Sequence, residues 1–185
     1  MKGSILFVGR FQPLHNGHYS VMEEALQRFP DHQLIIVLGS AQESLTKKNP
    51  WNQYERFNMV SGAFYARGQY KYSIPNFRIV AVDDNPTNHP AWAANILEMT
   101  KLHNPTKIIG YRKDESSFYL DLFPSLELIE VEPQRVMSAT DVRKEYFTNQ
   151  PTWNKDIPRS VAMYLEDWKM HKPDRFEQIA SLYED

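Results

Sequence analysis

Five short apolar runs recur along the chain, separated by stretches with helical periodicity. The runs are rich in β-branched residues and almost continuously apolar, as expected for strands that are covered on both faces. They are residues 4–8, 34–38, 77–82, 107–109 and 126–131. The helical patterns between them are residues 19–29, 53–67, 91–102 and 116–122. This alternation predicts an α/β fold with a Rossmann-like parallel sheet of about five strands and helices on both faces.

Three more helical patterns follow the last run. They are residues 139–147, 160–169 and 175–183, and Pro151, Pro158 and Pro173 separate them. A chain of 185 residues is long enough for one domain with a substantial core. We therefore predict a single domain over 1–185, with a Rossmann-like part over 1–137 and a C-terminal helical part over 138–185.

Composition excludes several classes of protein. A formal net charge of −2 favours neither nucleic acid nor an anionic membrane as a partner. The chain has no cysteine, so disulfides and thiolate metal sites are excluded. No apolar run approaches the roughly 20 residues that span a bilayer, and no signal segment precedes the first strand. These features predict a cytoplasmic protein.

The first apolar run leads directly into Gly9-Arg10-Phe11-Gln12-Pro13-Leu14-His15-Asn16-Gly17-His18. A turn between a strand and a helix is where α/β sheets bind phosphates, because helix N-terminal amides and the helix dipole favour anions. Glycine and proline let the backbone pass close to a ligand. His15 and His18 can donate hydrogen bonds to phosphate oxygens, and Arg10 adds fixed charge. The turn therefore predicts nucleotide chemistry.

This decapeptide resembles the (H/T)-x-G-H signature of the nucleotidyltransferase superfamily. Its fuller form resembles the archaeal-type nicotinamide-mononucleotide adenylyltransferases, which also occur in bacteria fused to a Nudix hydrolase domain. The resemblance implies ATP binding by residues of the turn, namely Gly9, Arg10, Phe11, Gln12, His15 and His18. It also implies Mg²⁺ bound with ATP, no metal site of the protein's own, and a homo-oligomer, because relatives commonly self-associate. The alternative is a pair of surface histidines beside a turn that Gly17 caps.

Two further segments match phosphate-binding motifs of the same family. In Met137–Arg143 the side chain of Ser138 is expected to cap a helix, with Asp141 at its third position. The resemblance assigns Ser138, Thr140 and Arg143 to the β- and γ-phosphates of ATP. In the polar loop after the second strand, Lys48 lies two residues before a proline, where the family has a basic residue that reaches the triphosphate. The alternative there is a solvated lysine.

The segment from Val82 to Trp92 resembles the part of the family that recognises nicotinamide. By that resemblance Trp92 stacks on the pyridinium ring, a cation–π contact, while Asp84 and Asn88 read the carboxamide. A tryptophan in the first turn of a helix otherwise belongs to the core.

The block that begins at Gly110 also resembles the Nudix-fused bacterial branch. Gly110 would let an adenosine lie against the backbone. Lys113 and Asp114 either orient substrate, shape the pocket, or simply begin a charged helix.

Together these motifs imply transfer of the adenylyl group of ATP to nicotinamide mononucleotide, giving NAD and pyrophosphate. The mechanism is in-line attack without a covalent intermediate, with His15, His18 and Arg143 as the catalytic residues. A phosphate nucleophile is already ionised near pH 7, so no general base is required. Two alternatives remain: a different adenylyl- or cytidylyltransferase, for example one acting on phosphopantetheine, and a non-catalytic module that senses NAD or ATP.

Overall fold

The computed structural model describes residues 2–66, 76–112, 115–132 and 136–184. The chain divides into two compact units, each assembled from several segments. The first, which we call the sheet unit, comprises Met1–Gly9, Ser20–Ala41 and Asn76–Gln134. The second, which we call the helical unit, comprises Arg10–Tyr19, Gln42–Pro75 and Arg135–Asp185.

The sheet unit contains a five-stranded sheet in the order β3-β2-β1-β4-β5. Its strands are β1 (Ser4–Gly9), β2 (Gln33–Leu38), β3 (Phe77–Ala81), β4 (Pro105–Gly110) and β5 (Glu127–Glu130). Every neighbouring pair is parallel. The sheet confirms the predicted fold class, and each strand lies within two residues of its predicted bounds.

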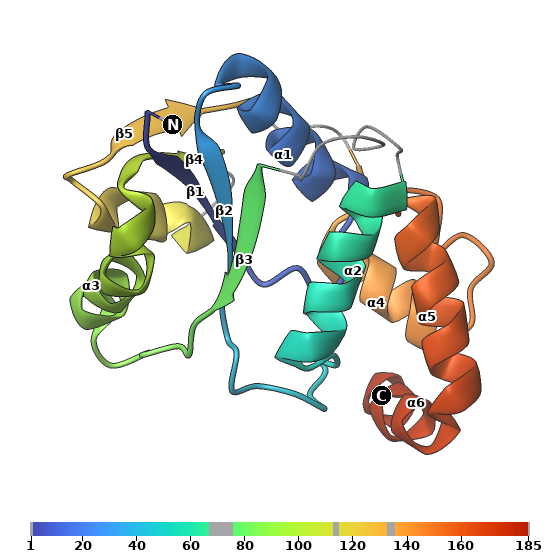
Figure 1. The fold of residues 1–185 in the computed structure, drawn as a ribbon. Coiled ribbons are helices and arrows are strands. Elements are labelled where there is room, and N and C mark those ends of the chain that lie inside the picture. The colour runs from blue at the N-terminus through green and yellow to red at the C-terminus, as the bar shows by residue number, and fades with distance from the viewer. Residues whose placement is uncertain (1, 67–75, 113–114, 133–135, 185) are drawn as a thin grey trace. The chain divides into compact units, whose positions relative to one another are not determined.

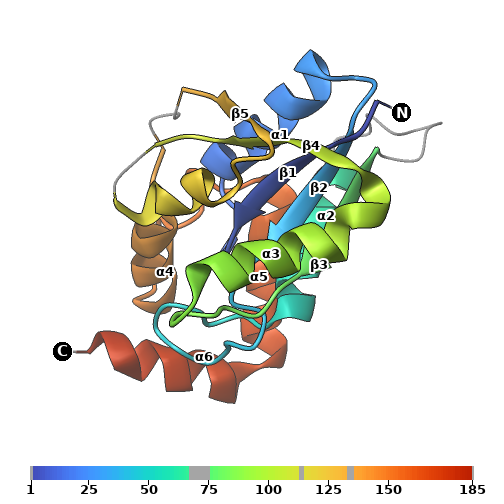
Figure 2. The same cartoon turned by 90° about the vertical axis from the view of Figure 1, so that its left-hand side faces the viewer.

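Helices α1 (Asn16–Arg28) and α3 (His89–Thr100) lie on opposite faces of this sheet (Figure 1). In Figure 2, α3 crosses in front of the strands. Because strand side chains alternate between faces, one set packs in a single cluster with α3. Its buried members are Leu6, Val8, Ile35, Val37, Val82, Ala93, Ile96, Ile108, Leu120 and Phe123.

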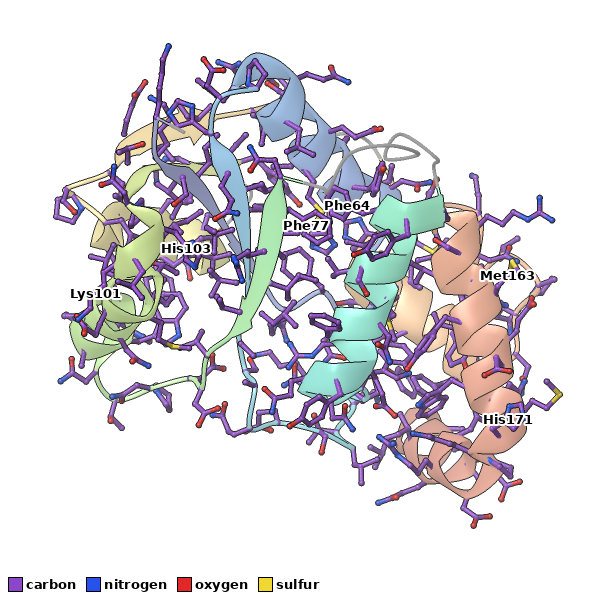
Figure 3. All side chains as sticks on the ribbon, viewed as in Figure 1. Phe64, Phe77, Lys101, His103, Met163 and His171 are labelled. Atoms are coloured by element: carbon purple, nitrogen blue, oxygen red, sulfur yellow. The ribbon has the colours of Figure 1, made fainter. Side chains whose placement is uncertain are left out.

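The predicted helix near residues 116–122 is a 3₁₀ helix, η2 (Glu115–Leu122). Another short 3₁₀ helix, η1 (Lys101–His103), continues α3 and ends at Asn104, whose φ of 49° is left-handed. Lys101 and His103 lie together at this end of α3 (Figure 3). In the described part of the chain, no helix is both long and apolar enough to cross a membrane.

The helical unit is built around aromatic side chains. Its elements are α2 (Gln53–Ala66), α4 (Ala139–Phe147), α5 (Arg159–His171), α6 (Pro173–Ala180) and the 3₁₀ helix η3 (Ser181–Tyr183). Helices α2 and α5 lie side by side (Figure 1). Between the helices pack Trp51, Tyr146, Phe147, Trp168 and Phe176. Met163 and His171 project outward from α5 (Figure 3).

A capping box lies at the start of α2. Asn52 accepts a hydrogen bond from the amide of Glu55 at 3.0 Å, and the Glu55 carboxylate accepts one from the amide of Asn52 at 2.9 Å. This reciprocal pair satisfies amides that the first helical turn leaves without partners.

Candidate active site

Helix α1 begins at Asn16, three residues earlier than predicted, and the His15 ring explains why. Nδ1 of His15 accepts hydrogen bonds from the amides of Gly17 at 3.1 Å and His18 at 3.3 Å. The ring thus serves as the N-cap that a serine or aspartate usually provides. His18 consequently lies in the first turn of the helix rather than in the preceding loop.

These contacts also assign the protonation of the histidine pair. A nitrogen that accepts two amide hydrogens carries no proton, so the neutral His15 ring is protonated at Nε2. Nδ1 of His18 accepts from the amide of His15 at 3.5 Å, which favours the same tautomer there. The two rings stack, with centroids 3.7 Å apart and an interplanar angle of 26°. In both residues the ring hydrogen is therefore at Nε2, and the two rings are stacked.

Gln12 connects the first turn to the loop before α2. Its side-chain amide donates to the carbonyl of Trp51 at 2.7 Å and accepts from the amide of Trp51 at 3.1 Å. Gln12 is 1% exposed. The side chain that was predicted to bind ATP is therefore engaged with backbone. Phe11, in the same turn, has a left-handed φ of 51° and its ring packs edge-on against His18.

Arg143 is buried, and in the described structure neutral oxygens accept its hydrogen bonds. Nε donates to the carbonyl of Lys47 at 3.1 Å, Nη1 to the carbonyl of Gln12 at 2.7 Å, and Nη2 to Oγ1 of Thr140 at 3.1 Å. Burial lowers the pKa of Arg143, but a guanidinium remains charged at any physiological pH. The helical unit thus holds a fixed positive charge that joins α4, the first turn and the Lys48 loop.

Helix α4 begins as the sequence predicts. Oγ of Ser138 accepts from the amide of Asp141 at 3.2 Å and donates to its carboxylate at 2.6 Å. The hydroxyl of Thr140, which accepts from Arg143, retains its own hydrogen for another acceptor. Lys48 is exposed in the loop before α2. Within the helical unit, Arg143 therefore connects the turn that carries His15 and His18 to the backbone beside Lys48.

In the sheet unit, two of the predicted nicotinamide-binding residues have local structural roles. The Asp84 carboxylate accepts hydrogen bonds from the amide of Ser40 at 3.0 Å and from its hydroxyl at 2.6 Å. Ser40 has a left-handed φ of 51°, so Asp84 stabilises an unfavourable backbone conformation. Asn88 is the N-cap of α3 and accepts from the amide of Ala91 at 2.9 Å.

Trp92 differs from these two residues. Its ring packs against Phe123 with centroids 6.2 Å apart, on the edge of the sheet-unit core. Its Nε1–H is buried without a hydrogen-bond partner in the described structure. An unpaired buried donor costs free energy, so this site favours a ligand with an acceptor.

Gly110 is the last residue of β4. A Cβ built on it would lie 3.0 Å from Cδ2 of Leu120, so a larger residue here would require the Leu120 side chain of η2 to shift. Tyr119, also in η2, donates to the carbonyl of Val8 at 3.3 Å, and burial raises its pKa to about 12. Lys113 and Asp114 lie outside the described residues.

A family model described as cytidylyltransferase-like matches residues 6–145. The nicotinamide/nicotinic acid mononucleotide adenylyltransferase of Acinetobacter baylyi is 36% identical over 166 residues, covering 89% of this chain and 86% of that protein. The chain belongs to this family of adenylyltransferases. A nicotinamide-nucleotide adenylyltransferase of Picrophilus torridus is 31% identical over 167 residues, covering 86% of this chain and 88% of that protein. The family resemblance read from the motifs is confirmed.

A solved structure has the same fold. It is a bifunctional NMN adenylyltransferase/ADP ribose pyrophosphatase from Francisella tularensis, complexed with AMP and a manganese ion. The TM-score is 0.77 at 21% identity, and the match covers 98% of this chain and 52% of that protein. The chain therefore spans about half the length of this structural relative.

Two residues of this adenylyltransferase chain contact the site although no recognisable motif marks them. Arg56, fully buried, donates to the carbonyl of Arg10 at 2.8 Å. Asp156 accepts from the amide of Met137 at 2.8 Å through its carboxylate and from the amide of Asn16 at 2.8 Å through its carbonyl. These contacts link segments far apart in sequence, so no local pattern could have indicated them.

Asn49 is a further candidate that the motifs did not single out. It is 5% exposed, and its Oδ1 is buried without a hydrogen-bond partner in the described part of the chain. Its backbone is held by Thr46, whose hydroxyl accepts from the Asn49 amide at 2.9 Å. The helical unit therefore contains, next to Lys48, a buried amide oxygen whose bonding capacity is unused in the described structure.

Proposed function

We propose that the protein transfers the adenylyl group of ATP to nicotinamide mononucleotide, giving NAD and pyrophosphate. A phosphate oxygen of the mononucleotide attacks the α-phosphorus of ATP in line, and the bond from that phosphorus to the bridging oxygen of pyrophosphate breaks. The names of relatives that align over most of the chain support this reaction. Since the attacking phosphate is ionised near pH 7, no side chain has to remove a proton.

The single observation that carries the proposal is the arrangement of His15 and His18. Each Nδ1 is occupied by backbone amides, so each Nε2–H is preset as a donor. Two oriented neutral donors suit the oxygens of a polyphosphate, because they need no reorganisation as negative charge develops on the departing pyrophosphate. Arg143 adds a fixed positive charge in the same unit.

Lys48 and Thr140 complete the proposed triphosphate site. Lys48 supplies an exposed cation, and the Thr140 hydroxyl donates to a phosphate oxygen while accepting from Arg143. In the described residues no group of three or more histidine, aspartate and glutamate side chains comes together to hold a metal ion. The donors here are cationic or N–H groups, which fit phosphate oxygens, so the triphosphate itself would carry the divalent cation. Such a cation neutralises phosphate charge.

Recognition of nicotinamide is assigned to the segment around α3. The Trp92 ring stacks on the cationic pyridinium of the mononucleotide. Asp84 and Asn88 hold the backbone of this region through Ser40 and the N-terminus of α3. In this proposal Asp84 and Asn88 affect nicotinamide binding indirectly, because they hold the backbone conformation of the segment that carries Trp92.

The proposal is tested by measuring pyrophosphate release with ATP, Mg²⁺ and nicotinamide mononucleotide, with NAD identified as the product. We expect His18→Ala to reduce turnover by a factor on the order of 10², as for loss of one preorganised oxyanion donor. His171→Ala is the matched control, because this histidine is exposed on α5. Turnover of a folded His18→Ala protein within a few fold of wild type would refute the assignment. If a product forms only with another phosphate acceptor, the protein is a different transferase.

A further inference from the structure

The carbonyl of Lys47 is held by side chains from two distant parts of the chain. It accepts hydrogen bonds from Nε of Arg143 at 3.1 Å and from the hydroxyl of Tyr183 at 3.1 Å. The ammonium of Lys47 also lies 4.6 Å from the centroid of the Tyr183 ring, a cation–π contact. Both the backbone and the side chain of Lys47 are thus engaged by Tyr183.

Tyr183 is itself held in place. It belongs to η3, and its ring stacks on Phe147 of α4, with centroids 5.8 Å apart and an interplanar angle of 13°. Burial raises the pKa of the Tyr183 hydroxyl, although the nearby Arg143 charge opposes the shift. The hydroxyl therefore remains a donor throughout the neutral range. Because the Tyr183 ring is held by Phe147, its hydroxyl has a fixed position from which to donate to the Lys47 carbonyl.

The hydrogen bonds to the Lys47 carbonyl also position the backbone of Lys48. The Lys47 carbonyl shares a rigid peptide plane with the amide nitrogen and Cα of Lys48. Two hydrogen bonds to that carbonyl therefore fix the point from which the exposed Lys48 side chain extends. Fixing the backbone before the ligand arrives reduces the ordering cost that binding must otherwise meet.

We propose that Tyr183 is a positioning residue for the nucleotide site, which holds the Lys47–Lys48 peptide so that Lys48 engages the triphosphate of ATP. The inference rests on the proposed function, because that proposal places the triphosphate at Lys48. Helical periodicity around residues 175–183 indicates no such role, since Tyr183 and Lys47 lie 136 positions apart.

Tyr183→Phe tests this role, because it removes the hydroxyl while keeping the ring that stacks on Phe147. We expect the KM for ATP to rise about three- to tenfold, the range for loss of one neutral hydrogen bond. The KM for the mononucleotide should change by less than about twofold, because the variant leaves that site intact. Leu182→Ala, in the same 3₁₀ helix, is the control and should leave both values unchanged.

A double-mutant cycle with Lys48→Ala distinguishes positioning from general stabilisation. If Tyr183 acts through Lys48, Tyr183→Phe will have no further effect on ATP affinity in the Lys48→Ala background. An equal loss of ATP affinity in both backgrounds would overturn the inference. So would an unchanged ATP affinity in Tyr183→Phe.

Calorimetric titration of the full chain with ATP alone separates this inference from the proposed reaction. A Kd for ATP that depends on Tyr183, in a protein that forms no NAD, would refute the reaction and retain the positioning role. Normal NAD formation with a Kd for ATP that does not depend on Tyr183 would support the reaction and refute the positioning role. Absence of ATP binding by the wild-type protein would overturn both.

Discussion

Glu55 is a buried carboxylate with several hydrogen-bond donors around it, and its loss should measurably destabilise the helical unit. Its side chain is 5% exposed and accepts from Nζ of Lys172 at 2.8 Å, from Nη1 of Arg175 at 2.6 Å and from Nε1 of Trp168 at 2.7 Å. It therefore joins α2 to α5 and α6. Glu55→Gln removes the charge but keeps an oxygen for the capping box with Asn52.

The magnitude follows from the exposure of the partners. Breaking a fully buried ion pair costs about 3–5 kcal/mol. The Lys172 and Arg175 side chains are 41% and 24% exposed, so water replaces part of the lost interaction. We therefore expect Glu55→Gln to lower the free energy of unfolding by about 2–3 kcal/mol. For a chain of this length that corresponds to a fall in Tm of roughly 5–10 °C.

Thermal unfolding followed by circular dichroism measures this change at pH 7. Glu177→Gln is the matched control, because it removes a carboxylate from an exposed position of α6 and should shift Tm by less than about 2 °C. A shift below 2 °C for Glu55→Gln itself would refute the reasoning, since it would mean that solvent already screens the cluster.

The pH dependence gives a second check with a defined sign. Burial raises the pKa of Glu55, but hydrogen bonds from Lys172, Arg175 and Trp168 outweigh it and hold the pKa below its usual value of 4.5. A carboxyl group with a lowered folded-state pKa stabilises the protein above its unfolded-state pKa, and that stability is lost as pH falls through the folded-state pKa. The difference between wild type and Glu55→Gln should therefore be full at pH 7 and shrink below about pH 4.5. A difference that stays constant down to pH 3 would contradict this account.

Three further outcomes are expected. Trp92→Ala should raise the KM for nicotinamide mononucleotide about three- to thirtyfold, because it removes a cation–π contact, and should change the KM for ATP little. Equal effects on both KM values would argue against ring stacking. Asn88→Ala should lower the free energy of unfolding by about 1 kcal/mol in urea titrations, whereas Asn88→Ser, which can still cap α3, should cost little; identical losses would show that capping is not its role. Gln12→Ala should lower the free energy of unfolding by about 1–3 kcal/mol in the same assay, because it leaves the buried amide and carbonyl of Trp51 unpaired. An unchanged free energy of unfolding would mean that water replaces the side chain.

Much of the sheet unit could be predicted from the sequence because its signals are local. Near-continuous apolar runs rich in β-branched residues suit strands covered on both faces, and all five lie where the runs do. The caps at Asn52 and Ser138 were equally visible, since their partners lie three residues away. The start of α1 was not, because the cap there is a histidine ring, which sequence preferences do not associate with helix N-termini.

The roles of individual site residues were less accessible. The resemblance assigns Gln12, Asp84 and Asn88 to ligands, and the structure adds hydrogen bonds from their side chains to protein groups. Such partners are chosen by which segments meet after folding. Two of these three residues bond to groups about forty positions away, and no periodic pattern reports a contact at that separation.

The sequence alone determined the class of fold, the family and the residue types available for phosphate chemistry, because periodicity, capping and short motifs act over a few neighbouring positions. The tertiary structure decided how those residues are used. It set the tautomers of His15 and His18, surrounded Arg143 with neutral oxygens, and brought Tyr183 to the carbonyl of Lys47. The physical reason is that a hydrogen bond depends on distance and direction in space, and only the folded chain supplies both between residues that are remote in sequence.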